Sequence, residues 1–216
     1  PFFGGPPRAP LATQTNIDVV ADFSDFSPRA SIAWKPSDEH NLYLSYAQGF
    51  KGGSFDPRCV AVTAPNIDGD AVAGSLDIDD QRAFCLFQPE DINTFEVGLK
   101  SNWDGGRYWS NFAVFLSDYK NVQIPGSYGV DTNGDGIADT FAGVTTNAAA
   151  ATLWGIEWEG MLGLARDFLS EGDGLNFQFS LGYINAEFDE YLGRGSPPPD
   201  VTNIAEFQNT PKVTAS

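Results

Sequence analysis

The chain has 216 residues, enough to bury a sizeable core in one large domain or in two smaller ones. It carries 12 Lys and Arg against 29 Asp and Glu, and the formal net charge of -17 argues against a nucleic acid or an anionic membrane surface as partner. A cationic or metal-bearing ligand fits this charge better. The 23 Gly, 14 Pro and 17 Phe, with one Met and one His, are typical of turns and aromatic-rich strands, so we expect an all-β fold.

The two ends of the sequence carry no targeting signal. No stretch approaches the roughly 20 apolar residues that a membrane helix needs, and the start, PFFGGPPRAP, has neither the basic region nor the apolar core of a signal peptide. The last residues, NTPKVTAS, resemble a strand that is interrupted midway. We therefore expect the chain to be a segment of a longer protein.

Segments with two-residue alternation follow one another along the chain and predict about six or seven strands. Short connections of turn residues alternate with long ones rich in Gly, Pro, Asp and Asn. The short ones cover 35–40, 102–106 and 165–174, and the long ones cover 51–90, 125–145 and 188–208. This organisation is typical of an antiparallel up-and-down meander with short turns at one end and long loops at the other, as in outer-membrane barrels.

Each predicted strand has one apolar face and one small or polar face. In 41–49, Leu42, Leu44 and Tyr46 share one side, opposite Tyr43 and Ser45. A soluble β-sandwich would alternate in the same way. Two predicted strands, however, run for 17 or 18 residues, over 107–124 and 146–162, and Trp lies near strand ends. These features favour a transmembrane barrel in which the apolar face contacts lipid and the polar face lines a wet or plugged lumen.

Several segments resemble, in order and spacing, consecutive pieces of the barrel of TonB-dependent outer-membrane receptors. They are FSPRASIAWKPSDEHNLYLSYAQGFKGGSFDPR, INTFEVGLKSNWDGGRYWSNFAVFLSDYKNVQI, NAAAATLWGIEWEG, LGYINAEFDEYL and NTPKVTAS, and together they extend over residues 26–216. Within them, YAQGFKGG is similar to the family's passage from strand to loop, TFEVGLKS to the strand that follows, and GIEWEG to a later strand. The whole of 1–216 is thereby expected to be part of one barrel domain.

The resemblance implies a large plugged barrel in the outer membrane of a Gram-negative bacterium, surrounded by outer-membrane lipid. Such receptors are energised by the TonB complex through an N-terminal plug, and they import scarce ligands such as ferric siderophores, cobalamin, haem or oligosaccharides. We expect a ferric siderophore here. The sequence departs from the family in having no plug, no TonB-contacting motif and no closing strand, so it would cover about a third of a barrel and leave strand edges open.

One acidic stretch has the spacing of a calcium-binding loop. In DTNGDGIAD, the residues Asp131, Asn133, Asp135, Ile137 and Asp139 follow the alternate-ligand pattern of an EF-hand, and Gly136 permits its sharp turn. Ala142 occupies the twelfth position, where a bidentate Glu would supply the strongest ligand. The stretch predicts either a structural calcium site or a solvated turn, and the fold requires no cofactor.

The long connection 51–90 carries two further features. Cys59 and Cys85 are the only cysteines, so a single intramolecular disulfide is available, and the alternative is two unpaired thiols in a flexible loop. Two acidic stretches, 66–70 and 77–80, form a second cluster that would either bind a cation or stay hydrated.

We expect no enzymatic activity. Glu157 and Glu159 lie two apart on one strand face, but the single His40 falls in a predicted turn without a nucleophile motif. Ligand contacts are expected from external loops, where Phe50, Phe55, Tyr128 and Phe141 are aromatic candidates. The alternatives to a receptor are a passive porin-like channel and a soluble β-sandwich that binds calcium or carbohydrate.

Overall fold

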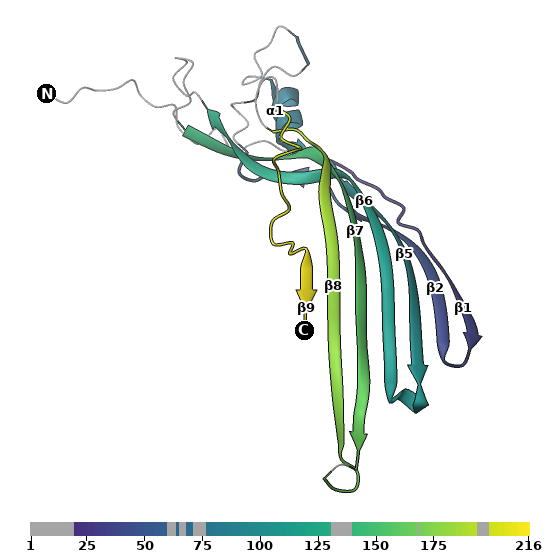
Figure 1. The fold of residues 1–216 in the computed structure, drawn as a ribbon. Coiled ribbons are helices and arrows are strands. Elements are labelled where there is room, and N and C mark those ends of the chain that lie inside the picture. The colour runs from purple at the N-terminus through teal and green to yellow at the C-terminus, as the bar shows by residue number, and fades with distance from the viewer. Residues whose placement is uncertain are drawn as a thin grey trace, which may run out of the picture. The chain divides into compact units, whose positions relative to one another are not determined.

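The computed structural model describes residues 20–59, 64, 68–70, 77–130, 140–167, 169–193 and 199–216. Seven strands form one antiparallel sheet in which each strand lies beside its neighbour in sequence (Figure 1). They are β1 (Arg29–Ser37), β2 (His40–Lys51), β5 (Glu90–Trp103), β6 (Tyr108–Val130), β7 (Thr140–Arg166), β8 (Gly174–Tyr191) and β9 (Val213–Ala215). The predicted all-β meander is confirmed.

Three further elements lie in the connection between β2 and β5. The short strands β3 (Ser54–Phe55) and β4 (Leu86–Phe87) pair with each other, and helix α1 (Ile78–Cys85) precedes β4. The helix was not predicted. Asp77 begins it as an N-cap, because its carboxylate accepts the backbone N–H groups of Asp79 and Asp80.

The short turns are built by residues suited to tight backbone conformations. β5 and β6 are joined by a 3-10 turn, Asp104–Gly106, in which Asp104, Gly105 and Gly106 all have positive φ. Between β7 and β8, the carboxylate of Asp173 accepts the backbone N–H groups of Leu169 and Ser170, both at 2.8 Å. These turns hold the neighbouring strands in an antiparallel register.

Two predicted boundaries were wrong. The connection expected over 125–145 is largely strand, because β6 continues to Val130 and β7 begins at Thr140. Pro125 lies inside β6: its φ suits an extended strand, and a single proline removes only one backbone donor. His40 is not in a turn either. It is the first residue of β2, its Nδ1 lies 2.9 Å from Ser101 Oγ, and its ring meets Trp103 edge to face.

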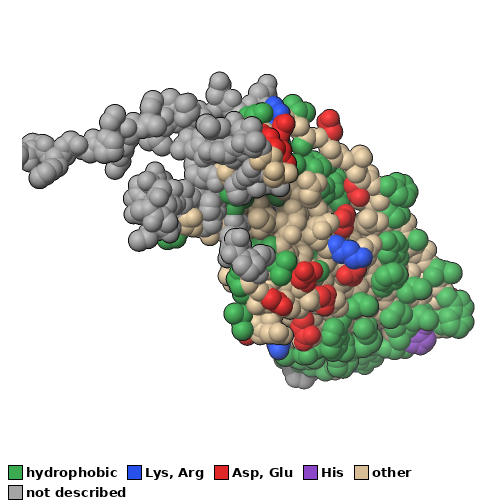
Figure 2. Space-filling model, turned by 90° about the horizontal axis from the view of Figure 1, so that it is seen from above, with side chains coloured by type: hydrophobic (Ala, Val, Ile, Leu, Met, Phe, Trp, Pro, Cys, Tyr) green, Lys and Arg blue, Asp and Glu red, His purple; other side chains and the backbone are tan. Residues whose placement is uncertain are grey.

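The register brings apolar residues of neighbouring strands together on one face of the sheet. Leu44 pairs with Val97, and Val97 pairs with Val114 on the next strand. Leu44 at 51% and Val97 at 44% remain exposed, and Val114 is half-buried. In the space-filling view, hydrophobic side chains cover the outer side, while carboxylates gather on the other side (Figure 2). None of the helices among the described residues is long and apolar enough to span a membrane.

The chain divides into two compact units. The first comprises Pro1–Ser24, Gly52–Pro89 and Gln123–Asn147, and it contains α1, β3, β4 and the adjoining ends of β6 and β7. The second comprises Asp25–Lys51, Glu90–Val122 and Ala148–Ser216, and it contains most of the sheet.

Candidate functional site

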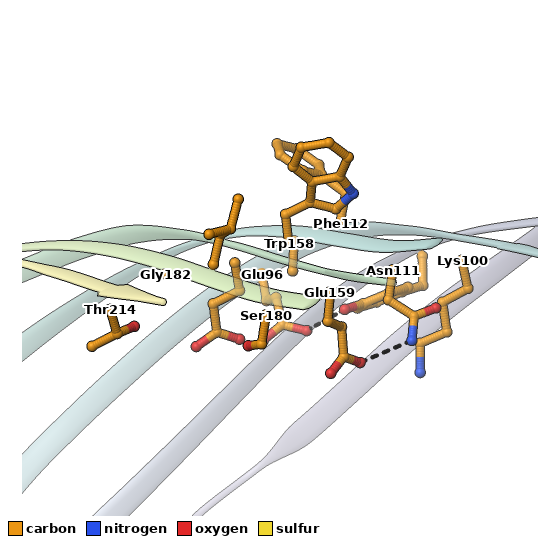
Figure 3. Close-up of a pocket in the computed structure, with 13 residues that line it drawn as sticks. Glu96, Lys100, Asn111, Phe112, Trp158, Glu159, Ser180, Gly182 and Thr214 are labelled. Carbon is orange, nitrogen blue, oxygen red and sulfur yellow. Dashed lines mark hydrogen bonds between the residues drawn. The ribbon is translucent and has the colours of Figure 1, made fainter. Parts of the chain in front are cut away.

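The polar face of the sheet carries a cluster of charged and amide side chains in the second unit. They border a cavity of about 310 Å³, and the polar ones come from six successive strands: Tyr43, Glu96, Lys100, Asn111, Glu157, Glu159, Ser180 and Thr214. Figure 3 shows Glu96, Glu159, Asn111 and Lys100 on one side of the sheet, while Trp158 and Phe112 point to the opposite side. We call the eight polar residues that border the cavity the polar-face cluster.

Tyr43 connects two of the charged residues of β5, Glu96 and Lys100. Its Oη donates a hydrogen bond to Glu96 Oε1 at 2.6 Å, and Lys100 Nζ lies 5.5 Å from the centre of its ring. The ring occupies the space above Gly98, where an added Cβ would lie 2.4 Å from Tyr43 Oη. Glycine is therefore required at position 98 for the tyrosine to lie flat across the strand.

A second hydrogen bond links β6 to β7 in the same cluster. Asn111 Nδ2 donates to Glu159 Oε1 at 2.9 Å, as the dashed line in Figure 3 shows. Glu157 and Glu159 do share a face, as the alternation predicted, but among the described residues their surroundings contain no histidine and no activated nucleophile. The cluster fits a hydrated inner surface better than an acid-base site.

The first unit contains a buried carboxylate that the sequence did not reveal. Asp56 is 5% exposed and accepts hydrogen bonds from Arg58 Nε at 3.0 Å, from the second Arg58 guanidinium nitrogen at 2.7 Å and from the Arg58 backbone at 2.9 Å. Thr145 Oγ1 donates a fourth, at 2.8 Å. These donors outweigh the cost of burial and lower the pKa of Asp56 to about 2, with the Arg58 side chain as the largest cause.

Cys59 and Cys85 are joined in a disulfide next to this carboxylate, with their Cα atoms 5.6 Å apart. The backbone adds two contacts, from Asp56 N to Cys85 O and from Cys59 N to Asp56 O, both at 3.0 Å. The disulfide therefore closes a segment whose two arms already lie side by side.

The two acidic stretches of the same connection approach each other. Carboxylate oxygens of Asp68, Asp70 and Asp77 lie within 4.8 Å of one another, and all three side chains reach solvent. Asp80 is 2% exposed and accepts the backbone N–H of Asp68 at 3.3 Å instead. Repulsion among the three clustered carboxylates would be relieved by a cation or by water.

The other predicted site residues are placed only in part. The calcium motif, with Asp131, Asn133, Asp135, Ile137 and Asp139, lies outside the described residues, and so does the side chain of Tyr128. Phe50 is 45% and Phe141 79% exposed, whereas Phe55 is half-buried in β3. Phe55 and Phe141 belong to the first unit and Phe50 to the second.

Comparison with protein families identifies a family for most of the chain. Residues 8–216 match the family model described as "TonB dependent receptor-like, beta-barrel". Proteins of this family are non-enzymatic transporters of the Gram-negative outer membrane, energised by TonB. The match extends over nearly the whole chain and agrees with the two-faced antiparallel sheet.

Proposed function

The chain belongs to the TonB-dependent receptors, and from this premise we propose that the receptor imports a ferric siderophore. Membership of this family implies TonB-energised transport across the outer membrane and interaction with TonB and with a transported ligand. A passive porin and a soluble β-sandwich, the two alternatives, do not fit this family. The observation that carries the transport function is the family match over 8–216, together with a sheet that is apolar on one face and charged on the other.

In this arrangement the polar-face cluster lines the lumen, and the apolar face contacts outer-membrane lipid. The cluster holds the carboxylates of Glu96, Glu157 and Glu159 against the single cation of Lys100. We expect TonB to act through a plug domain inside the barrel, as the family implies. A plug surface facing the cluster should therefore present cationic or hydrogen-bond-donating groups, because unpaired carboxylates would otherwise lose hydration.

The same charge balance bears on the ligand. Basic residues are sparse in the chain, and an anionic ferric siderophore would be repelled by an acidic inner surface. A neutral or cationic ferric siderophore is compatible with the described residues. An anionic one would need basic contacts from elsewhere in the barrel or its loops.

Iron uptake by a strain that lacks the gene tests this proposal. Cells that carry the full-length gene, or no copy, are grown under iron limitation and supplied with radioactive iron on neutral, cationic or anionic siderophores. We expect gene-dependent and TonB-dependent uptake of at least one neutral or cationic complex. If no siderophore supports uptake while cobalamin, haem or an oligosaccharide does, the siderophore assignment is wrong and the family function stands.

We also propose a structural calcium ion for the motif that begins at Asp131. Its support is the spacing of its oxygen ligands, which alternate as they do in calcium loops. Titration of the intact receptor with calcium in a calorimeter should give heat that Asp135→Ala abolishes. If the wild-type receptor gives no such heat, or if the variant keeps it, the motif is a solvated turn.

A further inference from the structure

The segment between β8 and β9 is hydrogen-bonded to β8 at two places. At the end of β8, the Tyr191 backbone N–H donates to Thr202 Oγ1 at 2.7 Å, and the Val201 N–H donates to Tyr191 O at 2.9 Å. Nearer to β9, the Ile184 N–H donates to Lys212 O at 3.0 Å, which continues the pairing of β8 with β9 by one position. The segment is therefore held to β8 at Ile184 and at Tyr191.

Between these two places, the edge of β8 that faces away from β7 has no neighbouring strand. We call this the outer edge. Backbone groups on one edge of an antiparallel strand recur at every second residue, so Ala186 and Phe188 follow Ile184 there. Among the described residues, no backbone hydrogen bond reaches the outer edge at Ala186 or Phe188. Asn209 has a φ of 56°, which is left-handed and takes the returning chain out of the extended path that would cover this edge.

A cavity of about 490 Å³ lies at this edge, between β8 and the returning segment. Ala186 and Phe188 line it from β8, and Phe207 lines it from the segment. The Phe188 and Phe207 rings stack, with their centroids 4.3 Å apart and an angle of 11° between the planes. The volume falls in the range of small-ligand sites, roughly 300–1,000 Å³. Because the stacked rings join the two walls, the cavity is preformed.

Charged side chains of opposite sign line the two ends of the cavity. Glu187 and Glu206 each precede one of the two stacked phenylalanines, so they belong to the end near the rings. Lys212 belongs to the other end, where its backbone accepts the Ile184 N–H. This arrangement complements a molecule that carries a positive group at one end and a negative group at the other.

From the open edge and these charges we propose that the cavity binds a short peptide with free termini, which adds to β8 as an antiparallel strand. Exposed strand edges bind extended peptides in this way, through backbone hydrogen bonds. A peptide in line with β9 has its amino group near Glu187 and Glu206 and its carboxylate near Lys212. At about 3.3 Å per residue, about four residues cover the edge from Phe188 to Asn185. The site does not depend on the iron ligand proposed above.

Calorimetric titration of the full-length receptor in detergent with tetra-alanine tests the backbone contacts. This peptide offers only peptide groups, methyl groups and two charged ends, and we expect a dissociation constant on the order of tens of micromolar. Its third residue would lie opposite Ala186 with its N–H toward β8, whereas the N–H of its second residue points away. N-methylation of the third residue should therefore weaken binding at least about tenfold, and N-methylation of the second should change it little.

Lys212→Ala tests the orientation of the peptide. The variant should bind tetra-alanine roughly tenfold more weakly than the wild type, because a charge-assisted hydrogen bond to the carboxylate is lost. Tetra-alanine amide has no carboxylate and should bind the variant and the wild type equally. Lys35→Ala is the matched control, since it removes the same charge from an exposed position of β1 that does not line the cavity.

Three outcomes would overturn the proposal. If tetra-alanine gives no binding heat with the wild type, the cavity is not a peptide site. Equal binding of the two N-methylated peptides would mean that the outer edge of β8 does not pair with the ligand. A loss of affinity in Lys212→Ala that is the same for tetra-alanine and its amide would mean that Lys212 supports the segment and does not bind the carboxylate.

Discussion

At the scale of single residues, Gly98 shows how a missing side chain shapes the polar face. The Tyr43 ring lies where a Cβ at position 98 would be, and from there its hydroxyl reaches Glu96. No larger residue leaves room for this contact. The glycine in the TFEVGLKS segment thus has a steric role that alternation alone did not reveal.

Gly98→Ala should lower the stability of the folded receptor by about 1–3 kcal/mol, since the tyrosine must move and its hydrogen bond to Glu96 is strained or lost. Gly52→Ala is the matched control, because nothing lies within 4 Å of an added Cβ there. The midpoint of thermal unfolding in detergent measures both. Equal midpoints for the two variants would show that Tyr43 is not held against Gly98.

The lowered pKa of Asp56 predicts how the stability of the first unit changes in acid. Its pKa is lowered from 3.8 to about 2 in the folded chain, so its contribution is complete above about pH 4 and is lost as the pH falls through about 2. The difference corresponds to about 2 kcal/mol, and the carboxylate is buried, so solvent screens it little. Hydrogen exchange of the amides in 52–59 and 77–89, corrected for intrinsic rates, should show protection that falls between pH 4 and 2.

Asp56→Asn supplies the control for this pH dependence. The amide cannot ionise, so protection in the variant should already be low at pH 7 and should change little on acidification. A variant with the same acid profile as the wild type would assign the loss of protection to other carboxylates.

At the scale of elements, the sequence predicted the strands better than it predicted what connects them. Alternation identified β2, β5 and β8 because each has a run of at least three apolar residues at two-residue spacing on one face. It underestimated β6 and β7, since Gly, Pro and Asn near their ends resemble loop composition. It missed α1 because the helix has only 8 residues and lies among turn residues, although Asp77 is a recognisable N-cap.

The cap gives a prediction for α1. Asp77→Ala removes an acceptor of two backbone N–H groups, at 2.8 Å from Asp79 N and 3.4 Å from Asp80 N, and should destabilise the helix by about 1 kcal/mol. Faster hydrogen exchange of the α1 amides measures this effect. Asp79→Ala, which breaks only an exposed pair with Arg82, should leave exchange nearly unchanged. Similar exchange rates in both variants would show that Asp77 does not cap the helix.

At the scale of the whole molecule, the two faces of the sheet determine which substitutions lower the stability of the inserted barrel. Leu181 is 42% exposed on the apolar face, and Ser180 beside it points to the polar face (Figure 3). Leu181→Arg should lower the stability of the inserted barrel by about 2–4 kcal/mol if the residue lies near the bilayer midplane. Ser180→Arg should be tolerated, because Ser180 pairs with Glu159 across the strands.

Urea titration of the receptor refolded into lipid vesicles compares these two variants. Equal losses of stability would mean that the faces are not divided between lipid and lumen. Tolerance of Leu181→Arg with loss in Ser180→Arg would reverse the assignment of the faces.

The candidate sites, like the strands and helix, could be predicted where a local sequence pattern marks them and not where they depend on long-range contacts. The polar face could be predicted from alternation, because Glu96 and Lys100 share one side of β5 and Glu157 and Glu159 share one side of β7. The contact between Asp56 and Thr145 could not, since 89 residues separate them and no local pattern marks a long-range hydrogen bond. Only the tertiary structure brings such residues together.

The lengths of β6 and β7 have a consequence outside the membrane. They contain 23 and 27 residues, whereas a tilted strand needs about 10 to cross the bilayer. At roughly 3.3 Å per residue, the surplus of each strand is some tens of ångströms long. A hairpin of that length would be accessible to antibodies and to bacteriophages that bind at the cell surface. This segment should therefore be the main epitope of the chain, and phage infection should select for sequence change in it.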